Sequence, residues 1–157
     1  MGLDRYDDRT AKYQEAVMEQ YKLYVETADR VSQRTAAVMT FFLTLNAGVF
    51  TIIGAIARAR DVDSLALLTL ALVVGLSQSA IWYALARHYR QLLTAKYFVV
   101  GVLEARLPSS PYYGGEWHAL GRGLERRLYV PITRFEAFAP GVSAAAYLAA
   151  YLLVILS

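Results

Sequence analysis

Two long stretches without a single charged side chain are the strongest constraint on how this chain folds. The first covers residues 36–57 and the second covers residues 64–86. A helix rises about 1.5 Å per residue, so each stretch is long enough to cross a hydrocarbon layer of about 30 Å. The intervening segment, residues 58–63, has room only for a tight hairpin turn. We therefore predict two membrane-spanning helices that run in opposite directions.

A third apolar stretch, residues 137–157, ends the chain. It is only just long enough to span a bilayer, and the alternative that it lies partly in the membrane interface stays open. Pro140 and Gly141 fall near its start, where proline fits the first turn of a helix. Hydrophobic residues make up 57% of the chain, more than the roughly 45–50% of a typical soluble domain. Part of this surface is expected to face lipid.

The distribution of Lys and Arg predicts the orientation. Six precede the first span and eight lie between the second and third, whereas the hairpin holds only Arg58 and Arg60. Cytoplasmic segments of membrane proteins carry the excess of positive charge. The N-terminus is thus predicted to be cytoplasmic and the C-terminus extracytoplasmic, with the bacterial inner membrane as the location.

Both of the first two spans continue as helices beyond the membrane. In residues 1–35, apolar side chains recur at steps of three and four, which is typical of an amphipathic helix: Tyr13, Val17, Tyr21, Tyr24, Ala28 and Val31. A similar stripe follows the second span through residues 87–107 and stops at Pro108. The two extensions are expected to pair as an antiparallel helical stalk.

Residues 108–136 differ from the rest in composition. Glycine and proline exclude a long helix, while the many aromatic side chains are not typical of a disordered linker. We predict an ordered, loop-rich cytoplasmic cap. The expected fold class is an all-α membrane protein with three transmembrane helices, a stalk and this cap.

Two polar side chains stand out within the spans. Asn46 and Gln78 lie at similar depths above the inner ends of their helices. The preferred interpretation is a hydrogen bond between them that fixes helix register. The alternative is that they line a pore in an oligomer. No ionisable side chain lies inside a span, which argues against a pump or a charge-coupled transporter.

Small residues gather in the spans, at Gly48 and Gly54 in the first and from Gly141 to Ala150 in the third. Small side chains let helices approach closely in lipid. These faces are interpreted as contacts in an oligomer, with packing inside one chain as the alternative.

Charged and aromatic residues mark the inner mouth of the spans. The candidate charge cluster consists of Asp29, Arg30, Arg34, Arg87 and Arg90. Its preferred role is anchoring in the lipid head groups, and pairing between the two helices is the alternative. Trp82, Tyr83 and Tyr89 are expected to form an aromatic belt in the same leaflet.

The cap contains the candidate recognition residues Trp117, Arg122, Arg126 and Arg127. Glycines beside three arginines suggest a phosphate-binding loop, but no P-loop pattern is present, so a structural turn is preferred. The chain has no cysteine and only two histidines, which are far apart, so neither a metal site nor a cofactor is expected. Because no catalytic arrangement of side chains can be assembled, we expect no enzymatic activity.

A resemblance covers residues 20–140. The segments that carry it are Ala28-Asp29-Arg30, Phe41–Asn46, Glu104–Pro108, Glu116-Trp117, Leu120–Gly123, Tyr129-x-Pro131 and Glu136-x3-Pro140. Together they resemble the RipA family of small octameric bacterial membrane proteins. The resemblance implies a ring-like homo-oligomer of the inner membrane, linked in some members to growth inside host cells. A looser analogy connects such proteins with effectors of phage defence.

Two functional hypotheses follow. In the first, the chain is a non-enzymatic homo-oligomer that acts as a pore or membrane scaffold in host adaptation, stress or defence. In the second, it is a membrane-anchored module whose cap binds a cytoplasmic protein partner or a nucleotide. The expected partners are lipid and further copies of the chain, and nucleic acid is not expected, because the net charge is only +3.

Overall fold

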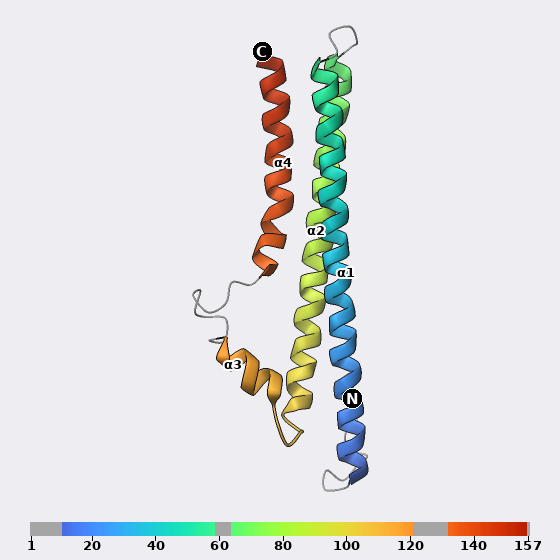
Figure 1. Cartoon of the computed structure of the whole chain (residues 1–157), viewed down its shortest axis with the longest axis vertical. Helices are drawn as coiled ribbons and strands as arrows, with labels where there is room; N and C mark the ends of the chain where they lie inside the picture. The colour runs from blue at the N-terminus through green and yellow to red at the C-terminus, as the bar shows by residue number, and fades with distance from the viewer. Residues whose placement is uncertain (1–10, 59–63, 121–131, 157) are drawn as a thin grey trace. The chain divides into compact units, whose positions relative to one another are not determined.

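The computed structural model describes residues 11–58, 64–120 and 132–156, and none of these residues forms a strand. Two very long helices, α1 (Ala11–Arg58) and α2 (Ser64–Glu104), are followed by the short helical segments η1 (Pro111–Glu116) and α3 (Trp117–Ala119). A last helix, α4, covers Ile132–Leu156. Figure 1 shows α1 and α2 as unbroken ribbons.

Three described helices are apolar and long enough to cross a membrane: α1, α2 and the part of α4 from Phe138 to Leu156. At 1.5 Å per residue α1 is about 72 Å long and α2 about 62 Å, so each is roughly twice the thickness of a hydrocarbon layer. A large part of both helices must therefore lie outside the hydrocarbon.

The chain divides into two compact units. Unit 1 consists of Met1–Gln33 and Arg90–Pro131, and unit 2 consists of Arg34–Tyr89 and Ile132–Ser157. In unit 1 a core of Tyr13, Val17 and Leu103 joins α1 to α2. The residues that the helical period selects on α1 are the ones on this buried side, including Ala28 and Val31.

The core of unit 2 joins three helices. Ile53 of α1, Leu68 of α2 and Tyr147 of α4 form its buried centre. Outside this core, many large apolar side chains are exposed in unit 2, such as Phe41, Leu153 and Leu156. A surface of this kind is not sustained in water and fits contact with lipid or with further protein.

Two expectations for the spans are wrong in detail. Pro140 does not lie in the first turn, because α4 begins at Ile132 and the proline lies inside the helix. Trp82 is not part of an aromatic belt that faces lipid, because it is only 1% exposed. Its ring stacks on Phe42 at 5.5 Å and its indole N–H donates to Met39 Sδ at 3.3 Å, so it belongs to the packing between α1 and α2.

Candidate functional site

Asn46 lies at the centre of a polar cluster within unit 2. It is 6% exposed, and its Nδ2 donates to the carbonyl oxygen of Phe42 at 2.7 Å. Its Oδ1 accepts two hydrogen bonds from α4, from Ser143 Oγ at 2.5 Å and from Tyr147 OH at 2.6 Å. One amide side chain therefore donates to a carbonyl of α1 and attaches α4 to this helix.

Gln78 lies near this cluster but is not hydrogen-bonded to Asn46. Asn46 bonds to the Phe42 carbonyl of α1 and to two hydroxyls of α4, and among the described residues Gln78 Nε2 has no hydrogen-bond partner. The Gln78 amide lies close to the Tyr147 hydroxyl. Both Asn46 and Gln78 are buried inside the unit, which favours inter-helix contact over lining of a pore. Their role in a pore remains an untested prediction.

Tyr147 fills the space between the three helices. It is 1% exposed, and its ring stacks on Phe50 with the ring centres 4.5 Å apart. The ring also covers Gly75 of α2: a Cβ added there would lie 2.8 Å from three ring atoms. Thr69 Oγ1 and Tyr151 OH, 3.1 Å apart, form a second link between α2 and α4. Close packing at Gly75 is what allows Tyr147 to reach Asn46.

Gly75→Ala is therefore expected to destabilise unit 2 by about 1–3 kcal/mol, because the added methyl overpacks against the Tyr147 ring. The measurement is the thermal unfolding midpoint of the detergent-purified protein. Gly54→Ala is the matched control, since its Cβ would meet no described atom within 4 Å. Equal midpoints for the two variants would show that the Tyr147 contact does not hold α4 in place.

The small residues serve different purposes. Ser143 is used inside the chain, where it donates to Asn46. Gly48, Gly54 and Gly141 face open space, because no described atom beyond their own helix turns lies within 4 Å of where their Cβ atoms would be. These three glycines therefore provide no packing within the described part of the chain.

Unit 1 has its own polar centre at Glu104, the last residue of α2. Glu104 is only 1% exposed, and its carboxylate accepts four hydrogen bonds. Oε1 accepts from Tyr21 OH and from the backbone N–H of Tyr112, both at 2.9 Å. Oε2 accepts from Ser110 Oγ at 2.9 Å and from the backbone N–H of Tyr113 at 2.7 Å. The lone pairs of this carboxylate are fully used, so it is a structural group rather than a base or a ligand.

Glu104 contacts the turn at residues 110–113, where η1 begins. The carbonyl of Ser110 accepts from the backbone N–H groups of Gly114 and Gly115, both at 3.1 Å, so Ser110 caps η1. Proline follows at the first helical position, where a missing N–H has no cost. A carboxylate beside the first free N–H groups of a helical segment is favoured by their partial positive charge.

This environment changes the acidity of Glu104, which lies well beyond the charge-free stretch that ends at Ala86. Burial alone would raise the pKa of this carboxyl, but the N–H groups of Tyr113 and Tyr112 and the hydroxyls of Tyr21 and Ser110 lower the pKa below its ordinary value of 4.5. Burial and the neighbouring carboxylate raise the pKa of the Tyr21 phenol, so it remains a donor at neutral pH.

Aromatic stacking fastens η1 to α2. Tyr112 stacks on Tyr97 with the ring centres 5.2 Å apart, and the Tyr113 ring lies against Gly101. Residues 111–116, at the described start of the predicted cap, thus pack on α2.

A separate contact joins α1 to α2 in unit 1: Lys96 lies over the Tyr24 ring, 5.7 Å from its centre.

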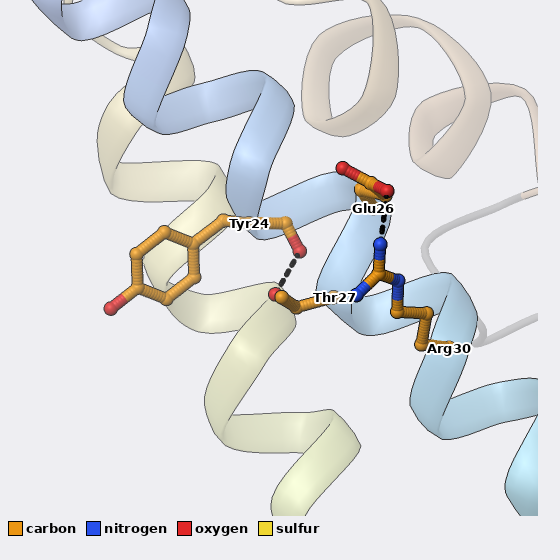
Figure 2. A network of polar contacts seen from close by, with 4 residues as sticks. All are labelled: Tyr24, Glu26, Thr27 and Arg30. Carbon is orange, nitrogen blue, oxygen red and sulfur yellow. Dashed lines mark hydrogen bonds and ion pairs between the residues drawn. The ribbon is translucent and has the colours of Figure 1, made fainter.

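All five residues of the predicted charge cluster are exposed. Arg30 pairs with Glu26 one turn earlier on α1 at 2.6 Å, and Figure 2 shows this pair on the side of the helix away from Tyr24. Exposed pairs of this spacing stabilise a helix by about 0.3–0.5 kcal/mol. The other members, Asp29, Arg34, Arg87 and Arg90, are exposed as well.

The role of the recognition residues of the cap stays a prediction. Trp117 opens α3, and its side chain lies outside the described part. Arg122, Arg126 and Arg127 lie outside the described residues altogether. The residues described here contain no cluster of His, Cys, Asp and Glu that could hold a metal ion.

Long apolar helices, an apolar exterior and buried polar links together define an all-helical integral membrane protein. The chain belongs to the octameric membrane protein family, which it matches over residues 18–156. Contact with lipid and self-association follow from this membership. No curated protein and no solved structure matches the chain.

Proposed function

We propose that this chain forms a ring-like homo-octamer that acts as a non-enzymatic scaffold in the bacterial inner membrane. The observation that carries the proposal is the apolar exterior of unit 2, where large side chains such as Phe41, Leu153 and Leu156 are exposed to lipid or to further copies of the chain. Membership of an octameric family supplies the number of subunits. The distribution of Lys and Arg supports a cytoplasmic N-terminus.

The two polar centres support a structural role. Asn46 and Glu104 are buried, and both are engaged in hydrogen bonds within their own units. Polar groups whose hydrogen bonds are made within the chain are not available to bind or activate a substrate. The resemblance to the RipA family extends the proposal to host adaptation, with stress or defence responses as the related setting.

A scaffold and a pore differ in what the ring encloses. The exposed side of α1 in unit 2 carries Thr40, Thr44 and Thr51, whose hydroxyls donate to carbonyls one turn earlier in the same helix. Their donors are used inside the helix, although each hydroxyl oxygen can still accept. The candidates for pore lining, Asn46 and Gln78, are buried within the unit, and we therefore favour a ring that does not conduct.

The experiment is mass measurement on the full chain in mild detergent and in nanodiscs. The expected protein mass is near 140 kDa, eight times the 17.5 kDa of one chain. A monomer in both media would overturn the proposal. Ion flux in liposomes tests the second part: flux that falls when Thr44 is replaced by leucine would show a pore and contradict the scaffold.

A further inference from the structure

An apolar groove runs along the outward side of α2 in unit 1. Its lining includes Arg90, Thr94, Ala95 and Phe98. Phe98 is 73% exposed, and Val102, one turn further along, is 43% exposed. An aromatic ring this exposed on a helix indicates a surface that another molecule covers.

Lipid is a poor candidate for the cover. Phe98 lies twelve residues beyond Ala86, where the charge-free stretch ends, which is about 18 Å along the helix. Arg87, Arg90 and Lys96 fall within or beside this segment. Charged side chains at this density keep a helix out of the hydrocarbon, so the groove needs a protein partner.

The outward side of α1 in unit 1 offers a matching surface. Leu23 is 58% exposed there. Tyr21 bonds to Glu104 and Tyr24 lies under Lys96, so Leu23 is level with the part of α2 that holds Phe98 and Val102. In subunits that share one membrane orientation, Leu23 of one copy and Phe98 of another therefore lie at the same height.

Charge favours the same pairing. The exposed charged side chains of α1 in unit 1 are acidic by one: Glu15, Glu19, Glu26 and Asp29 against Lys12, Lys22 and Arg30. Figure 2 shows Glu26 on the side of α1 away from Tyr24. The part of α2 in unit 1 exposes Arg90, and Glu104, the only acidic residue of its segment, is buried. An α1 surface that carries carboxylates is thus a better partner for this groove than a second α2 groove.

We propose that α1 of one subunit docks in the α2 groove of the next, with Leu23 against Phe98. Two different surfaces meet in this contact, and a head-to-tail contact of this type closes into a ring when its rotation allows. The inference rests on the proposed octamer and adds to it the residues that join the subunits outside the hydrocarbon.

Because the chain has no cysteine, cross-linking tests the contact directly. Leu23→Cys and Phe98→Cys chains are purified separately, mixed so that subunits exchange, and treated with a short bifunctional maleimide. We expect a covalent dimer from the mixture and almost none from either variant alone. Cross-linking of Phe98→Cys to itself would overturn the head-to-tail arrangement, and no dimer in any sample would overturn the contact.

A second readout is association strength. Phe98→Asp is expected to weaken octamer formation about tenfold or more, as loss of a buried aromatic anchor does. Ser32→Asp, which adds the same charge at an exposed position on the side of α1 away from Leu23, is the control and should leave the mass unchanged. Circular dichroism confirms that both variants are helical. If the wild type and Phe98→Asp are both octameric, the docking contact is wrong but the proposed octamer stands. If the wild type itself is monomeric, the proposed function is wrong.

Discussion

Asn46→Leu is expected to lower the free energy of unfolding of unit 2 by about 2–3 kcal/mol. The substitution removes the acceptor that Ser143 and Tyr147 share and leaves two hydroxyls between the helices without it. Gln78→Leu is the matched control of similar depth and burial. It removes a donor that has no hydrogen-bond partner in the described structure, so its effect should be about 1 kcal/mol or less.

Denaturant unfolding in micelles measures both variants. A further test adds Ser143→Ala and Tyr147→Phe to Asn46→Leu, which removes the stranded hydroxyls and is expected to recover part of the lost stability. Equal losses for Asn46→Leu and Gln78→Leu would show that the bonds to α4 contribute nothing specific.

Glu104→Gln is expected to destabilise unit 1 by about 3 kcal/mol, because an amide cannot accept on both sides as the carboxylate does. Hydrogen exchange at the backbone amides of Tyr112 and Tyr113 is the local readout, and both should lose protection. Glu116→Gln, at an exposed position, is the control. Unchanged protection at both amides would rule out the carboxylate as the group that orders η1.

The same carboxylate makes stability depend on pH. The pKa of Glu104 is lowered on folding, so its contribution is fully present above the ordinary value of 4.5 and is lost as the pH falls through the folded pKa. The difference in melting temperature between wild type and Glu104→Gln should therefore be constant near neutral pH and shrink below pH 4.5. A difference that grows on acidification would contradict this account.

The long helices could be predicted because their signals are local. Charge-free stretches and a period of three to four residues reveal α1 and α2 and the buried side of α1. The partner of Asn46 could not be found in this way. The sequence shows how far along its helix each residue lies, and this depth is similar for Asn46 and Gln78. It does not show which helices face each other, so it could not reveal that Ser143 and Tyr147 of α4 donate to Asn46.

Glu104 was missed as a site residue for a related reason. An acidic residue at the end of a long helix is unfavourable beside its carbonyl groups, and nothing in the helical stripe of α2 singles it out. What stabilises it is the start of the next helical segment. The pair Ser110-Pro111 is a typical cap and first position, and this signal was present in the sequence without showing where the turn would pack.

Pro140 has a consequence for the direction of α4. It removes the N–H that would pair with the carbonyl of residue 136 inside the helix. Hydrocarbon offers no replacement donor, so this carbonyl needs water from the head-group region or a donor from a neighbouring helix. A helix that lacks this bond can kink at the proline. The part of α4 before Pro140 therefore need not share the tilt of the span that follows it.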